Sequence, residues 1–257
     1  MAKVGLIGGS VTGKLLENAE VVKLNTPYGE MSSPIELGKI GEQEVAVLYR
    51  HGKEHKIPPH KINFRANIYG LKEVGVERII GVSAVGSLQK DIEPGAIALP
   101  DQFFDYTKGR DYTFFDGPEV VHISMADPFC PELLDTFHKS LIDLRIKSKK
   151  GGTYVCIEGP RFSTRSESKF FRGVGDIIGM TLVPEINLAR EKEMCYLTLA
   201  TVTDYDVWAD IPVNSKEVIR VMKENEENIK KVLTNAIPRI SAGRTCKCGL
   251  HLKEAGL

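Results

Sequence analysis

Two carboxylates follow one apolar run of the sequence, at a position where α/β proteins often bind ligands. Residues 194–202, MCYLTLATV, are rich in β-branched and apolar side chains and predict a buried strand. Asp204 and Asp206 come directly after this run, two positions apart. Ligands of open α/β sheets bind beyond the carboxyl ends of strands, so the pair is a candidate for acid–base chemistry. Acidic residues are also common in turns, and their spacing alone does not decide between the two interpretations.

Other predicted strands end in residues that suit an anion. Residues 3–10 end in a Gly-Gly-Ser turn, where backbone N–H groups can approach a phosphate and Ser10 adds a hydroxyl. Residues 45–52 end in Arg50 and His51, and a guanidinium can hold a phosphate through two hydrogen bonds. A tight turn and a solvated strand terminus are the alternatives. A metal site at His51, His55 and His60 is disfavoured, because these residues do not match a familiar ligand spacing.

The elements that position these residues alternate between strand and helix. Strands are expected at 78–84, followed by a glycine turn at 85–87, and at 94–99, 151–158 and 176–180. Helices are expected at 63–76, at 131–146, after a Ser163 or Thr164 cap, from Pro184, and from Asn214-Ser215. This order predicts an α/β fold of three layers, with a mixed, mostly parallel twisted sheet flanked by helices. Residues 101–130 are irregular and are expected to be functional or part of an interface.

The composition narrows the class of protein. The chain has 257 residues, of which 42% are apolar, and 34 Lys and Arg balance 34 Asp and Glu. The zero net charge argues against a large nucleic-acid footprint, and no apolar run reaches the ~18–20 residues that span a bilayer. We therefore expect a cytoplasmic protein that binds neither nucleic acid nor membrane. Residues 1–240 are expected to form one domain and 241–257 a peripheral tail.

The tail contains Cys246 and Cys248, whose state stays open. They could be two exposed thiols on a loose tail, or form a strained Cys-x-Cys disulfide. A metal site that uses His251 is the least supported interpretation, because a structural zinc ion needs four ligands and the nearby sequence does not supply them. Cys130, Cys156 and Cys195 lie in apolar segments and are expected to be small buried thiols.

Taken together, the motifs resemble one family. GLIGGS (5–10), YRHG (49–52), SAVGSL (83–88), EGPRFSTRSE (158–167), GMTLVPE (179–185) and TDYDVW (203–208) occur in the order of the trimeric purine nucleoside phosphorylases, especially their 5′-methylthioadenosine phosphorylase branch. The resemblance covers about residues 3–240. It implies a sheet with barrel character and the phosphorolysis of a purine nucleoside, with inorganic phosphate as co-substrate and no other cofactor.

The resemblance also assigns roles to individual residues. It places phosphate against Ser10, Arg50, His51, Ser83, Ala84 and Thr181. It gives protonation of the leaving base to Asp204, with Asp206 beside it, and we expect burial and the like-charged neighbour to raise the pKa of one of them. Phe162 would pack on the purine, Ser163 would reach its edge, and Met180 would lie under the ribose.

The 5′ end of the substrate is assigned to His122 from a neighbouring subunit, which implies a homotrimer or a dimer of trimers. Ser215 occupies another pocket position, where some relatives have an apolar residue. An ionised Asp204 favours the exocyclic amine of adenine, so S-methyl-5′-thioadenosine is the expected substrate. S-methyl-5′-thioinosine and other 6-oxopurine nucleosides are the alternative.

Two other classes of protein are less compatible with the sequence. GLIGGS resembles the start of a dinucleotide site, but it lacks the third glycine of that fingerprint. A nucleoside-binding protein without activity would have lost the phosphate residues, whereas Arg50, His51 and Thr181 are present.

Overall fold

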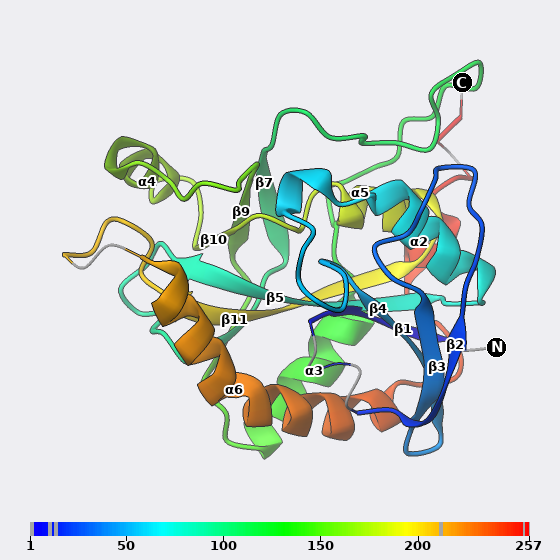
Figure 1. The fold of residues 1–257 in the computed structure, drawn as a ribbon, viewed down its shortest axis with the longest axis horizontal. Coiled ribbons are helices and arrows are strands. Elements are labelled where there is room, and N and C mark those ends of the chain that lie inside the picture. Colours follow the sequence, from blue (N-terminus) through cyan, green and yellow to red (C-terminus); the bar gives the residue numbers. More distant parts are fainter. Residues whose placement is uncertain (1–2, 10–11, 13–14, 211–212, 254, 257) are drawn as a thin grey trace.

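The computed structural model describes residues 3–9, 12, 15–210, 213–253 and 255–256. Its strands form one mixed sheet in the order β2-β3-β4-β1-β5-β10-β9-β7, and β11, β6 and β8 extend it from β5 (Figure 1). The strands are β1 Val4–Gly8, β2 Glu17–Val22, β3 Ile35–Ile40, β4 Gln43–Tyr49, β5 Arg78–Ser87, β6 Ile97–Leu99, β7 Gln102–Tyr106, β8 Ser148–Lys150, β9 Thr153–Ile157, β10 Ile177–Gly179 and β11 Cys195–Asp204.

The pairings near the centre are mostly parallel. β5 pairs in parallel with β1 on one side and with β11 on another, and β1 pairs in parallel with β4. Antiparallel pairs occur where β10 meets β5, where β6 meets β11, and in the β2-β3-β4 segment. The predicted α/β class with a mixed, mostly parallel sheet is confirmed.

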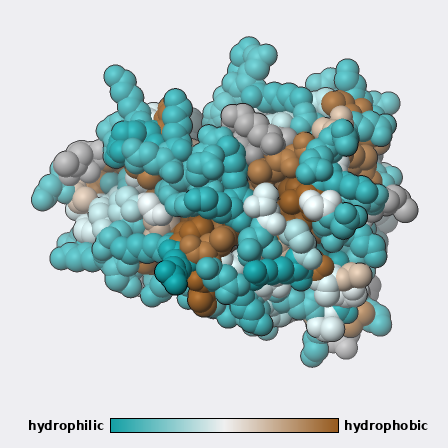
Figure 2. All heavy atoms as spheres, turned by 90° about the horizontal axis from the view of Figure 1, so that it is seen from below, coloured by the Kyte–Doolittle hydropathy of each residue, from teal (hydrophilic) through white to brown (hydrophobic). Residues whose placement is uncertain are grey.

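Helices cover both sides of the sheet. In Figure 1, α2 and α5 lie above the central strands, and α3 and α6 lie below them. The helices are α2 Phe64–Glu73, α3 Pro131–Asp143, α4 Arg165–Phe171, α5 Glu185–Glu191 and α6 Ser215–Ala236, with short 3₁₀ turns η1 Pro59–Lys61, η2 Ile237–Arg239 and η3 Lys247–Leu250. Figure 2, which views the molecule from below, shows a mainly hydrophilic surface with scattered hydrophobic patches, as expected where helices face solvent.

The helix starts follow the capping residues in the sequence. The Thr164 side chain accepts a hydrogen bond from the Glu167 N–H, and the Glu167 carboxylate accepts one from the Thr164 N–H. The two bonds form a capping box at the start of α4. Asn63 and Asn214 cap α2 and α6 in the same way through their side-chain oxygens. Pro184 is the N-cap of α5, next to its predicted place in the first turn.

Three local predictions need correction. β5 continues through Ser87, so the predicted turn at 85–87 does not form; β11 and β10 pair with this part of β5 and keep it extended. The segment 101–130 is not wholly irregular, because β7 pairs in parallel with β9. Cys248 is 6% exposed and Cys246 is half-buried, so of the interpretations left open for the tail, that of two exposed thiols is wrong.

Candidate active site

The ends of four strands bring most of the predicted site residues together. Arg50 follows β4, Ser83 and Ala84 lie in β5, Thr181 follows β10, and Asp204 ends β11. The strand register places Ala200 beside Ser83 and Asp204 beside Gly86. A Cβ on Gly86 would lie 2.8 Å from Asp204 Oδ1, so only glycine leaves room for this carboxylate. Parallel pairing of β5 with β1 and β11, and antiparallel pairing of β5 with β10, thus bring distant sequence motifs together.

Protein acceptors take most of the hydrogen bonds that the Arg50 guanidinium can donate. Its Nε and Nη2 donate to the two oxygens of Glu185 at 2.7 and 2.8 Å, and Nη2 also donates to Ile7 O at 3.4 Å. Nη1 donates to Val82 O at 2.8 Å. A guanidinium has five N–H donors, so these four bonds leave one Nη1–H for a ligand. Arg50 and Glu185 are 3% and 0% exposed, and Glu185 raises the Arg50 pKa although burial alone would lower it.

His51 is neutral at physiological pH. Burial, and then the charge of Arg50, lower its pKa to about 4. Its Nδ1 lies 2.8 Å from Ile57 O, and a carbonyl can only accept, so Nδ1 carries the hydrogen. In this tautomer Nε2 is a hydrogen-bond acceptor. It can therefore receive the hydroxyl of a monoprotonated phosphate.

Several buried polar atoms have no hydrogen-bond partner among the described residues. They include Ser83 Oγ and Tyr154 OH near Arg50, Ser163 Oγ in the EGPRF loop, and Asp206 Oδ2, whereas others, such as His138 Nδ1 and Asn225 Nδ2, lie on α3 and α6. Buried polar groups are normally hydrogen-bonded, and unpartnered ones call for an explanation. A polar ligand would satisfy those that lie at the predicted site.

The two acids lie at the other end of the site. Asp204 Oδ2 accepts from the Thr203 hydroxyl at 2.7 Å, and Oδ1 accepts from the Asp206 N–H at 2.8 Å. These bonds fix the carboxylate plane. Burial raises the pKa of both acids, and neither forms an ion pair with any part of the chain that the structure describes. The expected effect of the like-charged neighbour is minor: it is a lesser cause for Asp206 and none is resolved for Asp204.

The residues predicted to contact the sugar and the base differ in their exposure to solvent. Ser163 is 8% exposed, Met180 is half-buried, and Phe162 is 37% exposed. Gly159 has a φ of +66°, and a Cβ there would lie 2.5 Å from Met180 Sδ. The EGPRF motif therefore uses its glycine to let the chain pass close to the methionine.

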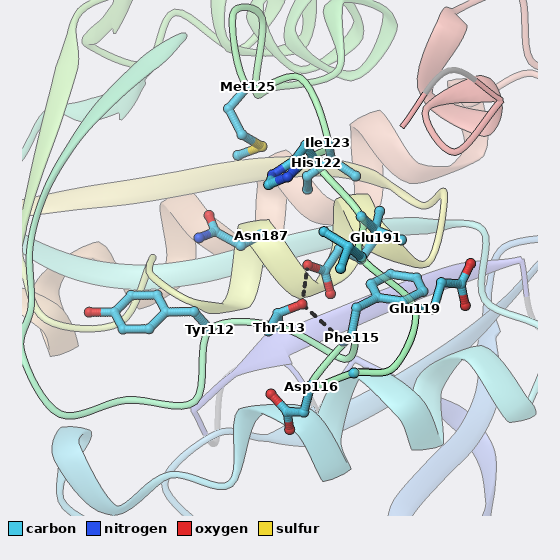
Figure 3. Close-up of a pocket in the computed structure, with 13 residues that line it drawn as sticks. Tyr112, Thr113, Phe115, Asp116, Glu119, His122, Ile123, Met125, Asn187 and Glu191 are labelled. Carbon is cyan, nitrogen blue, oxygen red and sulfur yellow. Dashed lines mark hydrogen bonds between the residues drawn. The ribbon is translucent and has the colours of Figure 1, made fainter. Parts of the chain in front are cut away.

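His122 lies apart from this constellation. It is exposed, and it lines a pocket of about 600 Å³ together with Tyr112, Met125, Asn187 and Glu191 (Figure 3). Its N–H donates to Ala255 O at 2.7 Å, so the C-terminal residues hold this segment in place. The structure brings no described atom of the Asp204 end into that pocket.

The structure gives little information on the predicted roles of Ser10 and Ser215. Ser10 lies outside the described residues. Ser215 is the exposed first residue of α6.

Sequence reasoning missed the side chains that position Arg50. Glu185 enters the sequence analysis only as the last residue of the GMTLVPE motif, yet its carboxylate accepts a hydrogen bond from Tyr196 OH at 2.6 Å. A Cβ on Gly81 would lie 2.5 Å from Tyr196 OH and 3.2 Å from Arg50 Nη2. The sequence around Glu185, a glutamate after a proline at a helix start, does not indicate that this side chain pairs with a buried arginine 135 positions away.

Comparison with known proteins decides the family. A family model described as "Phosphorylase superfamily" matches residues 3–238. The chain belongs to the phosphorylase superfamily.

Within this superfamily the chain is a member of the methylthioadenosine phosphorylase group. It is 57% identical over 253 residues to S-methyl-5′-thioadenosine phosphorylase of Pyrococcus abyssi, with 98% of each chain covered. It is 54% identical to the enzyme of that name from Saccharolobus solfataricus, covering 99% of this chain and 97% of the relative.

Solved structures agree with this placement. A methylthioadenosine phosphorylase from an Antarctic soil metagenomic library has a TM-score of 0.95 at 43% identity, covering 100% of this chain and 92% of the other. The Schistosoma mansoni methylthioadenosine phosphorylase in complex with adenine has a TM-score of 0.90 at 35% identity, covering 95% and 93%. Among the described residues no helix is long and apolar enough to cross a bilayer.

Proposed function

We propose that this chain catalyses the phosphorolysis of S-methyl-5′-thioadenosine to adenine and 5-methylthioribose 1-phosphate. The observation that carries the proposal is a site with two chemically different ends. One end holds a fixed cation, Arg50, and the other holds half-buried Asp204 and buried Asp206, with no counter-charge among the described residues. The identity to enzymes of this name supports the choice of reaction.

The Arg50 end would bind phosphate. The remaining Nη1–H of Arg50, the unpartnered hydroxyl of Ser83 and the Thr181 region at the end of β10 would donate to its oxygens, and His51 Nε2 would accept from its hydroxyl. Ser10 would complete this set, together with the backbone at Ala84. A phosphate held here would attack C1′ of the sugar and stabilise the positive charge that develops on it.

The Asp204 end would bind the purine. As the C1′–N9 bond breaks, the electron pair passes to the purine, and a proton from the acid pair neutralises it. Burial raises the pKa of both Asp204 and Asp206, which favours the protonated form of either acid relative to an exposed carboxylate. Phe162 would pack on the base and Met180 under the ribose, while the free Ser163 hydroxyl would contact the base edge.

We further propose that the site is completed in a homotrimer or a dimer of trimers. Phe104, Tyr106 and Phe170 form an exposed aromatic cluster on the edge strand β7 and helix α4, close in sequence to Phe162. His122 lies exposed in a different pocket. An interface on β7 and α4 would cover the base end and would let His122 of the partner subunit reach the 5′ group. Light scattering that shows a monomer at assay concentrations would contradict this.

Phosphate dependence tests the reaction. The purified chain, freed of phosphate, should release no adenine from S-methyl-5′-thioadenosine until inorganic phosphate is added. It should then form adenine and 5-methylthioribose 1-phosphate in equal amounts. Release of adenine without phosphate would make the protein a hydrolase, and no release under either condition would favour a binding protein. Localisation in the cytoplasm, which the composition suggests, would fit such a salvage reaction.

A further inference from the structure

Four of the five cysteines come together at a place remote from the strand ends that hold Arg50 and Asp204. Their sulfur atoms all lie within 4.8 Å of one another. Cys130 precedes α3, Cys195 begins β11 at the end opposite Asp204, and Cys246 and Cys248 come from the tail. The fifth, Cys156, lies in β9 and is not in the group. The fold thus supplies the two ligands that the sequence near Cys246 and Cys248 lacks.

The distances suit a shared ion better than a bond between two sulfurs. Four thiolates around a tetrahedral zinc ion at ~2.3 Å are about 3.8 Å apart. The sulfurs of Cys195 and Cys246 lie 3.4 Å apart. A disulfide requires about 2.05 Å. The sulfurs therefore converge on one centre.

The protein environment is prepared for an anionic centre. Arg190 is 5% exposed, and its guanidinium donates only to backbone carbonyls of Ser124, Asp127 and Pro128, while its charge interacts with Cys248 and Asp127. A second cation, Arg244, interacts with Cys195. Four thiolates on a divalent ion carry a net charge of about −2, which these cations would balance. Two neutral disulfides would leave Arg190 buried with less compensation.

The tail is seated by contacts that do not involve sulfur. Arg78 Nη2 donates to Gly243 O at 2.9 Å, Arg244 Nη1 donates to Glu193 O at 2.8 Å, and the Thr245 N–H donates to Glu132 Oε1 at 2.6 Å. These bonds position the tail segment that carries Cys246 and Cys248 without any contribution from sulfur. Cys130, Cys195 and Cys248 are buried, and Cys246 is half-buried.

We propose that Cys130, Cys195, Cys246 and Cys248 bind one soft divalent metal ion, zinc by preference, as a structural site. Each thiol gives up its proton to solvent as the ion binds. The ion would join the tail to the starts of α3 and β11 and has no part in the reaction at Asp204. This proposal departs from the expectation of no metal, which rested on the tail alone.

Metal and thiol analysis of the whole protein tests this proposal. The chain, purified without reductant from cells grown with zinc, should contain about one zinc ion per chain. After denaturation with chelator it should show all five thiols. No zinc with five thiols would overturn the proposal. No zinc with one thiol, the remaining Cys156, would overturn it in favour of two disulfides.

Spectroscopy and matched variants give a second readout. Replacing zinc with cobalt chloride in the wild-type protein should give the strong sulfur-to-cobalt charge-transfer band and visible bands of a tetrahedral site. Cys246→Ser and Cys248→Ser should lose the metal, whereas the control Cys156→Ser should retain it. Removing zinc by chelation should lower Tm by about 5 °C or more. An octahedral cobalt spectrum, or metal content unchanged in both tail variants, would contradict the assignment.

Discussion

Burial has opposite consequences for the ionisable groups at the two ends of the proposed active site. At the Arg50 end, burial would weaken a cation, but the Glu185 carboxylate keeps it charged through two short hydrogen bonds. At the Asp204 end, the same burial acts on two acids that have no cation beside them, and it raises their pKa values. Burial alone therefore does not set a residue's role; the presence of a counter-charge decides whether the group keeps its charge or can exchange a proton.

The largest effect is expected from removing the counter-charge of Arg50. Glu185→Gln would leave a buried guanidinium without a partner, which costs about 3 kcal/mol or more of unfolding free energy. It should also weaken phosphate use by at least about 100-fold in kcat/KM. Denaturant unfolding and initial rates at varied phosphate would measure both.

An exposed ion pair provides the matched control for that variant. Arg239 Nη1 lies 2.6 Å from Asp143 Oδ2, with side chains 43% and 54% exposed. Asp143→Asn should change stability by less than about 1 kcal/mol. Equal losses in the two variants would mean that burial of the Arg50–Glu185 pair is unimportant.

A smaller effect is expected at His51. In His51→Asn, the amide can still donate to Ile57 O, but the acceptor that corresponds to Nε2 is lost. The KM for phosphate should rise about tenfold, and the KM for the nucleoside should stay the same. His55→Asn is the control, because the exposed His55 ring stacks on His51 at 4.5 Å. A rise in the nucleoside KM instead would place His51 at the wrong end.

A still smaller effect is expected from the base end. Ser163→Ala removes a buried hydroxyl that has no partner among the described residues, so Tm should not fall. The kcat/KM for the nucleoside should drop about fivefold, as expected for one lost hydrogen bond to substrate. Thr164→Ala should do the reverse, because it removes the cap of α4 and lowers stability by about 1 kcal/mol. A loss of stability without a kinetic change in Ser163→Ala would argue against contact with the base.

The pH dependence of stability gives the smallest effect. The unfolded chain protonates His51 below about 6.5, whereas the folded chain does so only near 4. The unfolded state therefore binds more protons in this window, and stability is fully present above it and falls as the pH drops through it. The fall in Tm between pH 7 and pH 5 should be smaller in His51→Asn than in the wild type. An identical fall in Tm would mean that the pKa of His51 is not lowered in the folded protein.

The same contrast explains how much could be predicted from the sequence. The strand ends with Arg50, His51 and Asp204, the capping residues and the α/β class follow from local patterns that the chain carries within a few positions. The Glu185–Arg50 pair and the gathering of Cys130 and Cys195 with the tail depend on contacts between distant segments. β2 has no buried residue and β7 only half-buried and exposed ones, so neither shows the apolar run that predicts a buried strand.

The identity of the base end can be tested by one ratio of rates. An ionised Asp204 accepts from the amine of adenine, whereas an asparagine there can donate to the carbonyl of hypoxanthine. In Asp204→Asn, turnover of S-methyl-5′-thioadenosine should fall by about 100-fold or more. Turnover relative to S-methyl-5′-thioinosine, measured side by side at saturating phosphate, should shift toward the inosine compound. If both rates fall equally and their ratio does not change, Asp204 does not contact the base and the proposed arrangement of the two ends is wrong.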